Sequence, residues 1–249
     1  MTESDCRRFV VVATQRSGST LLVKSLDSAP TIFCAGEMFH GGPNTLHPEC
    51  NYPQKLLGSS LLGRVADRYF QGPRVRKHVL TFYSRQRAGI KAVGFKVMTS
   101  QLRSYHTLLP LLVATDTVRF FLHREDSFAA ALSTFRAKSS GVYHSDRVAV
   151  PASSQTVNAN PDEFQLLLKR SKAHRQEALD LHARYGGVLL TYESLIKHWD
   201  SLIAEMGDKL GIPQLRVGKA LDRIGDAAEP VRIGNLEELR EKFGSGTNP

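Results

Sequence analysis

The stretch from Phe9 to Leu26, FVVVATQRSGSTLLVKSL, constrains the fold more than any other part of the chain. It opens with a short apolar run, residues 9–13, in which β-branched residues dominate. Such a run is typical of a strand buried inside a parallel sheet. A polar loop follows, and leucines at helical spacing come next. The pattern therefore predicts a strand, a loop of small residues and a helix, in that order.

The predicted loop has the composition of an anion cradle. It consists of Thr14, Gln15, Arg16, Ser17, Gly18, Ser19 and Thr20. Backbone N–H groups of such a loop, together with the N-terminus of the next helix, converge on a phosphate. Gly18 allows a sharp turn, and Arg16 adds a positively charged fork of donors. The Lys and second Gly of a Walker A motif are absent, so no nucleotide-bound Mg²⁺ is expected. The competing interpretation is an ordinary strand-to-helix turn with an N-cap.

Composition places the chain among ordinary globular proteins. Its 249 residues are 41% hydrophobic and 23% charged, which fits one domain over residues 1–249. No apolar run approaches the ~20 residues of a membrane helix, and the N-terminus does not resemble a secretory signal. The three cysteines form no C-x-x-C pair, which argues against a disulfide framework or a zinc site. We therefore expect a cytoplasmic protein without a transmembrane segment or a bound metal.

Much of the positive charge lies in one segment, residues 64–91. The formal net charge of the chain is +9, and this segment holds eight Lys or Arg against a single acidic residue, Asp67. The simplest interpretation is a solvated helix face. The functional alternatives are an acidic acceptor, a polyanionic cofactor or a nucleic acid.

Apolar runs and helical patterns alternate along the rest of the chain. Further strands are predicted at 31–35, 92–97, 117–123 and 187–191. Helices are predicted at about 54–70, 73–88, 99–113, 126–137 and 160–185, with two more near the C-terminus. A break at residues 71–73 is expected to separate the helix at 54–70 from the helix at 73–88. Residues 139–160 are expected to form a long loop or lid. Alternating strands and helices predict an α/β fold, a parallel β-sheet flanked by helices.

A second candidate anion site combines Arg124 with Ser133. Arg124 ends a predicted strand, where open α/β sheets bind their ligands, and an arginine there suits a phosphate. Ser133 lies about two turns into the next helix, a distance compatible with a shared anion. The structural alternative is that Arg124 pairs with Glu125 or Asp126 while Ser133 packs.

Several motifs, in order along nearly the whole chain, resemble the PAPS-dependent sulfotransferases. The loop 14–20 is similar to their 5′-phosphosulfate loop, and residues 121–126 with Ser133 are similar to their 3′-phosphate motif. Gly36-Glu37-Met38-Phe39 resembles a Gly-Glu-x-Phe segment of the bacterial trehalose- and nodulation-factor-type enzymes. Further matches lie at 94–96, 191–195 and 233–238. Gln15 departs from the usual Pro, and Arg16 stands where the eukaryotic cytosolic branch carries Lys. These differences favour the bacterial carbohydrate-type branch.

The resemblance implies a P-loop-like fold and an enzyme that transfers the sulfuryl group of PAPS to an acceptor hydroxyl, releasing PAP without a metal. The acceptor would be a carbohydrate, a glycolipid or another small molecule, and a homodimer is a possible assembly. Glu37 is the predicted general base, with Arg16 as the second catalytic residue. The nucleotide would be held by Thr14, Gln15, Arg16, Ser17, Gly18, Ser19, Thr20, Arg124 and Ser133. For Glu37 the structural alternative is a pair with an arginine, and the rival bases are His40, His47 and His106.

Two other classes of function remain open. One is another P-loop small-molecule kinase, against which the missing Walker lysine counts. The other is a nucleotide- or nucleic-acid-binding module that uses the segment 64–91, although no recognisable RNA- or DNA-binding motif accompanies it. No residue identifies the acceptor.

Overall fold

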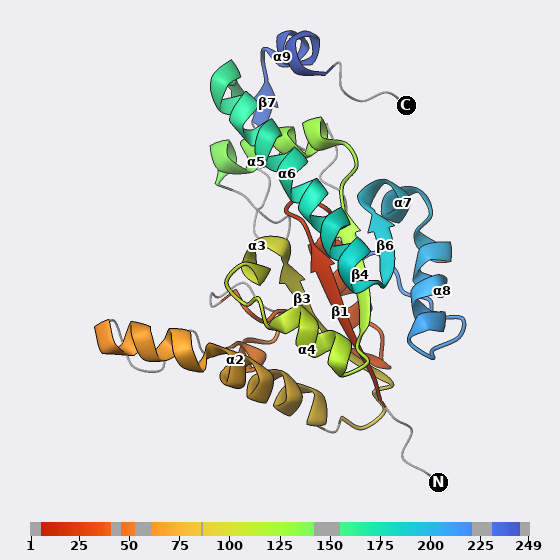
Figure 1. Cartoon of the computed structure of the whole chain (residues 1–249). Coiled ribbons are helices and arrows are strands. Elements are labelled where there is room, and N and C mark those ends of the chain that lie inside the picture. Colours follow the sequence, from red (N-terminus) through yellow and green to blue (C-terminus); the bar gives the residue numbers. More distant parts are fainter. Residues whose placement is uncertain are drawn as a thin grey trace.

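The computed structural model describes residues 6–40, 46–52, 61–85, 87–141, 155–220 and 231–244, with only the backbone considered for 61–70. Five parallel strands form the central sheet (Figure 1). They are β1 (Arg7–Ala13), β2 (Ile32–Glu37), β3 (Ala92–Met98), β4 (Val118–His123) and β6 (Val188–Thr191). Their order across the sheet is β2-β3-β1-β4-β6. The predicted α/β fold with a parallel sheet is confirmed.

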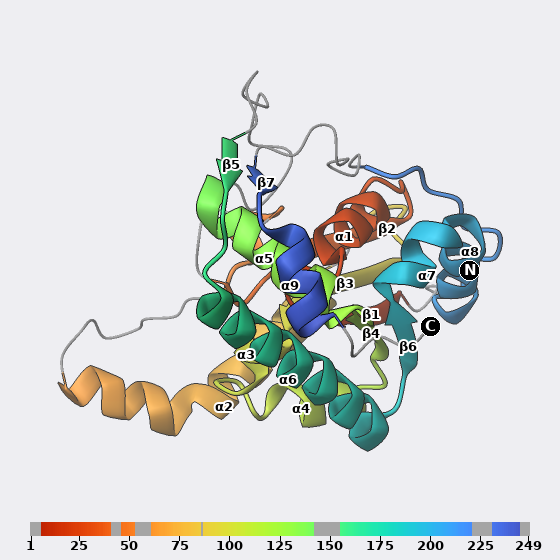
Figure 2. The ribbon, with the colours of Figure 1, turned by 90° about the horizontal axis from the view of Figure 1, so that it is seen from above.

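Strand β1 is the centre of the core because both of its faces are buried. Val10 and Val12 face a cluster with α2 (Leu61–Ser84), α4 (Leu108–Ala114) and the end of α6 (Pro161–Tyr185). Val11 and Ala13 face α1 (Ser19–Asp27), α7 (Tyr192–Lys197) and α8 (Trp199–Lys209). Figure 2 shows these two helical layers on opposite sides of the sheet. An apolar strand without alternation is the pattern that such double coverage requires.

Two helix predictions were wrong, and both involve proline. Helix α2 continues through Pro73, where a break was predicted. A proline removes one helical hydrogen bond, and burial of Val75, Val79 and Phe82 on the sheet holds the segment beyond it in place. The helix predicted at 99–113 is instead two, α3 (Thr99–Leu102) and α4. Pro110 lies in the first turn of α4, where its missing N–H has no helical partner to lose.

A smaller layer stands beyond the carboxyl ends of the strands. Helix α5 (Ser127–Ser140) and the start of α6 pack on the parallel pair β5 (Gln155–Val157) and β7 (Val231–Ile233), with α9 (Leu236–Phe243) beside them. Part of the segment predicted as a loop at 139–160 is therefore regular: α5 reaches Ser140, and β5 is a strand. The rest of that proposed lid, residues 142–154, lies outside the described residues. A short 3₁₀ turn, η1 (Pro48–Cys50), precedes α2.

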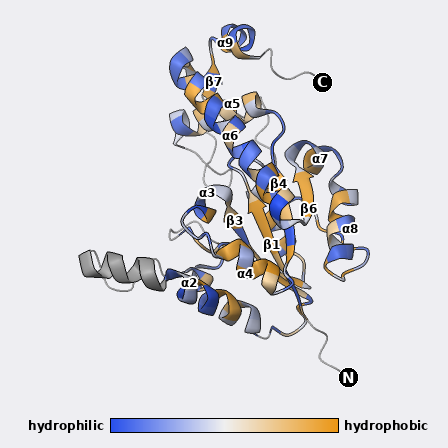
Figure 3. Ribbon diagram, in the orientation of Figure 1, coloured by the Kyte–Doolittle hydropathy of each residue, from blue (hydrophilic) through white to orange (hydrophobic). Residues whose placement is uncertain are grey.

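The apolar residues concentrate in the strands and the polar ones on the outer helices (Figure 3). Part of the basic segment 64–91 packs against rings: the Arg87 guanidinium lies 4.0 Å from the Phe33 ring, and that of Arg74 lies 5.5 Å from the Tyr52 ring. Arg76 and Lys77 are exposed on α2, as expected for a solvated helix face. In the described parts of the chain, no helix combines the length and the apolar character that crossing a bilayer requires.

Candidate active site

The strand order predicts a ligand site at the carboxyl end of β1. From β1 the chain passes to one side of the sheet for β2 and β3, and then crosses to the other side for β4. In open parallel sheets, such a reversal leaves a crevice in which ligands bind. The loop after β1 and the turn after β4 meet there, since the Thr14 N–H donates to the Leu122 carbonyl at 3.0 Å. Figure 1 shows these strand ends pointing toward α5.

The loop after β1 has the conformation of an anion cradle. Gly18 is the N-cap of α1 with φ of 77°, and Arg16 also has a positive φ, 60°. Within the described residues, the backbone N–H groups of Gly18, Ser19 and Thr20 make no hydrogen bond. These are the donors that a helix N-terminus offers to an anion. The Ser17 hydroxyl is instead buried and donates to the Thr14 carbonyl at 2.7 Å, so it stabilises the loop from inside.

The two predicted anion sites are in direct contact. The Arg16 Nε donates to the Ser133 hydroxyl at 2.9 Å, across 117 positions of sequence. Asp126 caps the N-terminus of α5 by accepting from the Ala129 N–H at 2.8 Å. With this cap, α5 begins at Ser127, three residues after Arg124, and its second turn carries Ser133 to the loop.

Arg124 is held by residues that sequence reasoning did not assign to the site. Its guanidinium carbon lies 4.4 Å from the centre of the Tyr192 ring, and its Nε lies 3.9 Å from a Glu193 oxygen. The ion-pair partner is thus Glu193 rather than the neighbouring Glu125 or Asp126. Glu193 also accepts hydrogen bonds from the backbone N–H groups of Glu125 and Asp126, at 3.1 and 3.2 Å. One carboxylate therefore holds both the turn after β4 and the arginine on it.

Tyr192 joins this arginine to the anion loop. A Cβ built on Gly18 would lie 2.8 Å from the Tyr192 ring, so the ring packs directly on the loop backbone. Tyr192 and Glu193 directly follow β6, the neighbour of β4, at the same edge of the sheet. Their position directly after an apolar run was the signal that would have placed them here.

His123, at the end of β4, directly precedes Arg124 in the sequence. Its side chain is buried, and this burial lowers the pKa of the imidazole. The ring is therefore neutral at physiological pH.

Glu37 ends β2 beside two hydrogen-bonding side chains. One carboxylate oxygen lies 3.4 Å from the Lys96 Nζ, and the other accepts from the Gln101 side-chain amide at 3.1 Å. Strand pairing sets the first contact, because Glu37 and Lys96 are partners in the β2–β3 register. The cationic partner is thus a lysine, where the structural alternative had expected an arginine. The Glu37 side chain is 17% exposed, so it is shielded yet accessible.

Of the three histidines weighed as rival bases, His40 lies next to Glu37. Its Nδ1 is 4.0 Å from a Glu37 oxygen, on a side chain that is 46% exposed. His47 is engaged elsewhere, with its ring nitrogens 3.0 Å from Asp27 and 3.3 Å from Glu49. His106 is exposed in the turn between α3 and α4.

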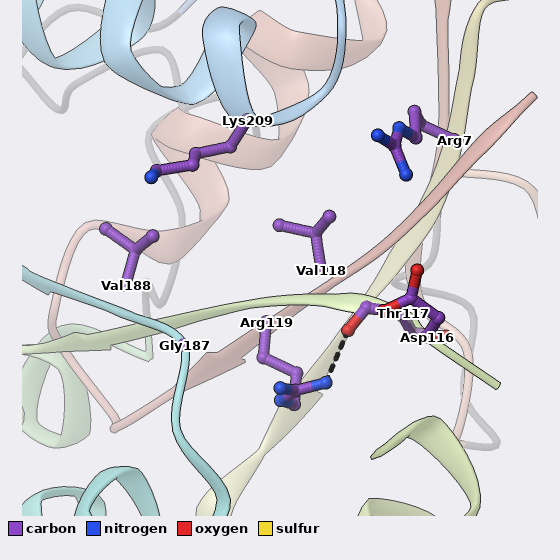
Figure 4. A pocket seen from close by; sticks show the side chains of 8 residues that line it. All are labelled: Arg7, Asp116, Thr117, Val118, Arg119, Gly187, Val188 and Lys209. Carbon is purple, nitrogen blue, oxygen red and sulfur yellow. Dashed lines mark hydrogen bonds between the residues drawn. The ribbon is translucent and has the colours of Figure 1, made fainter. Parts of the chain in front are cut away.

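A cavity of about 330 Å³ opens at the opposite, amino-terminal edge of the sheet (Figure 4). Arg7, Val118 and Val188, at the beginnings of β1, β4 and β6, contribute to its wall. The Arg119 guanidinium at this edge donates to backbone carbonyls, including that of Thr117 at 2.7 Å. The cavity therefore lies at the other edge of the sheet from the candidate site. Arg119 there stabilises the turns whose carbonyls it binds.

Comparison with known proteins decides the family. The model of the Stf0 sulphotransferase family matches residues 8–163, which is more than half of the chain. The chain belongs to the Stf0 sulphotransferase family. The matched segment of this family member contains the anion loop, Glu37, Arg124 and Ser133, and it ends before Tyr192 and Glu193.

Solved sulfotransferase structures resemble the chain at low sequence identity. A sulfotransferase from Alicyclobacillus acidocaldarius matches with a TM-score of 0.50 and 13% identity, over 96% of this chain and 91% of that one. The sulfotransferase domain from the curacin biosynthetic pathway has a TM-score of 0.48 and 15% identity, over 99% and 93% of the two chains. No curated protein matches the sequence significantly. Family and fold together support sulfotransferase activity on a small-molecule acceptor.

Proposed function

We propose that this Stf0 family member transfers the sulfuryl group of PAPS to a hydroxyl of a carbohydrate, a glycolipid or another small molecule, as a single domain. The observation that carries the proposal is the 2.9 Å contact between Arg16 and Ser133. It joins two anion sites at one crevice, and PAPS has two phosphate positions on one nucleoside. An anion ligand with a single phosphate would need only one of these sites.

The residues present fit such a nucleotide. The loop offers to the 5′ group the N–H groups of Gly18, Ser19 and Thr20, which make no hydrogen bond within the described part of the chain. The Arg124 Nε is buried and, among the described residues, has no hydrogen-bond partner. A buried donor without a partner is costly, and a 3′-phosphate would satisfy it with a charge-assisted hydrogen bond.

The chemistry follows from the positions of Arg16 and Glu37. PAPS supplies an activated sulfuryl group, whose bond to the 5′-phosphate breaks as the acceptor oxygen bonds to sulfur. Negative charge then grows on the 5′-phosphate, where Arg16 and the loop N–H groups bind it more tightly than in the ground state. Glu37 accepts the proton that leaves the acceptor hydroxyl. Catalysis is thus mainly positioning and electrostatics, as in phosphoryl transfer.

The proposal predicts that PAP stabilises the folded chain. Two anion sites that act together should give tight binding, and a ligand that binds only the native state raises Tm. At PAP concentrations of 100 times Kd, the free energy of unfolding should rise by about 2.7 kcal/mol. Thermal unfolding with PAP, ATP and a short RNA measures this. Stabilisation by ATP and none by PAP would favour the kinase alternative, and stabilisation by RNA alone would favour a nucleic-acid-binding module.

Arg124→Ala should weaken PAP binding by roughly 1.5–3 kcal/mol, because it removes a charge-assisted phosphate contact. Ser133→Ala should cost less, about 1 kcal/mol, since a neutral hydroxyl is lost. Calorimetric titration with PAP compares both with Arg103→Ala, an exposed arginine that pairs with Glu177 at 2.9 Å on the surface. Equal affinity in wild type and Arg124→Ala would remove Arg124 from the site.

A further inference from the structure

Lys96 is a buried lysine whose position in the sheet has a cost. It lies inside β3 and is only 6% exposed, and lysines are almost never buried so deeply unless they are paired. In the described residues its ion-pair partner is Glu37, at 3.4 Å. The nearby Cys34 does not compete for the ammonium, because burial raises the pKa of its thiol to about 12 and keeps it neutral.

Gln101 completes the environment of the Glu37 carboxylate from the other side. Its side-chain carbonyl accepts the Met98 N–H at 3.0 Å, which fixes the orientation of the amide. The amide nitrogen then donates to the Glu37 oxygen that Lys96 does not approach. Lys96, Met98 and Gln101 lie within six positions at the end of β3, so both donors belong to one rigid unit.

We infer that Lys96 and Gln101 are positioning residues, which hold the Glu37 carboxylate in a single orientation toward the carboxyl ends of the strands. Each carboxylate oxygen has two lone pairs, so one donor on each still leaves room for the acceptor's proton. The ion pair on one oxygen and the fixed amide on the other together restrict rotation of the carboxylate. The inference rests on the proposed function, since it assigns the residues that support the proposed base.

The test compares kcat in Lys96→Met, Lys96→Arg and Gln101→Glu. Lys96→Met should lower kcat by about 10²-fold, the effect expected of a misplaced catalytic group, and Lys96→Arg should recover part of it. Gln101→Glu keeps the acceptor for the Met98 N–H but sets a carboxylate against Glu37, so kcat should also fall by at least about tenfold. The PAP Kd should stay within about twofold, because neither residue contacts the anion loop. Lys91→Met, which removes an exposed lysine just before β3, is the matched control.

Turnover is measured as PAP released from labelled PAPS with a panel of sugars. If no sugar accepts the sulfuryl group, the hydrolysis of PAPS by water is measured instead. The decisive comparison is made in the Glu37→Gln background. There Lys96→Met should change kcat by less than about twofold, because a residue that acts through Glu37 has nothing left to position. A full additional loss in that background would show an independent role and overturn the inference. Wild-type kcat in both Lys96→Met and Gln101→Glu would overturn it as well.

Thermal unfolding of the ligand-free chain gives a readout that needs no PAPS. Lys96→Met leaves a carboxylate without its buried counter-ion and should lower Tm, and adding Glu37→Gln should recover part of that loss. If the Tm losses of Lys96→Met and Glu37→Gln simply add in the double variant, the contact between the two side chains does not stabilise the fold. If Lys96→Met does not fold, the inference is tested by the kcat of Gln101→Glu and by the Tm of the double variant that combines Lys96→Met with Glu37→Gln. Failure of PAPS cleavage and PAP binding in the wild type would contradict the proposed function itself, whereas an inactive Glu37→Gln beside a normal Lys96→Met would contradict only this inference.

Discussion

Glu37→Gln should nearly abolish turnover and leave PAP binding almost intact. The acceptor's proton must leave as the O–S bond forms, and an amide cannot accept it. Removal of a general base typically costs ~10²–10⁴ in rate, far more than an isosteric change in packing. The PAP affinity should hold, because Arg16, Arg124 and the loop are proposed to bind the nucleotide and Glu37 is not. Single-turnover rates with labelled PAPS, together with a PAP titration, measure both quantities.

The control for this variant must account for Lys96, which lies 3.4 Å from the Glu37 carboxylate. Glu37→Asp keeps the charge and shortens the reach, so it should fold like wild type and lose less activity than Glu37→Gln. If Glu37→Gln keeps more than about a tenth of the wild-type rate, the base lies elsewhere. His40, at 4.0 Å from Glu37, is then the next residue to change.

Arg16→Met should lower kcat by about 10²–10³-fold, the effect of removing one donor to a developing negative charge. Methionine keeps the Cβ and a long stem, so the backbone at φ 60° is not strained further. The PAP affinity should fall by a smaller factor than kcat, because the lost contact is stronger in the transition state than with bound product.

Arg76→Met is the matched control for Arg16, since Arg76 is exposed on α2 and contributes the same charge. It should leave kcat and the PAP Kd unchanged. Equal losses of PAP affinity and kcat in Arg16→Met would mean that Arg16 binds the nucleotide uniformly and has no special role in the reaction.

Local patterns were sufficient for much of the fold. The run at 9–13, the strands at 92–97 and 117–123 and the helix at 160–185 all lie where the sequence predicts them. Their burial explains this success, because a strand covered on both faces must be apolar throughout. The sequence failed where tertiary packing overrides a local signal, as at Pro73 inside α2. It also failed for β5 and β7, which are three residues each and pair across more than seventy positions.

The candidate site likewise has one part that the sequence suggests and another that only tertiary packing shows. The anion loop, Arg124, Ser133 and Glu37 can be identified from the sequence, because each lies at a strand end or near a helix N-terminus whose chemistry is local. The sequence places Tyr192 and Glu193 at a strand end, but it does not identify their partners, Gly18 and Arg124, which lie on two other strand-to-helix connections. The same holds for Lys96, whose contact with Glu37 depends on the register of β2 against β3.

The sequence by itself therefore determined which groups are candidates for the site: a loop of anion donors after an apolar strand, a second arginine and a carboxylate at a strand end. Only the tertiary structure decided which of these groups meet. Parallel strands that are neighbours in the sheet come from distant parts of the chain, so the order β2-β3-β1-β4-β6 is not written in any local pattern. That order brings Arg16 to Ser133, Tyr192 to Arg124 and Lys96 to Glu37, because it aligns the carboxyl ends of all five strands at one edge.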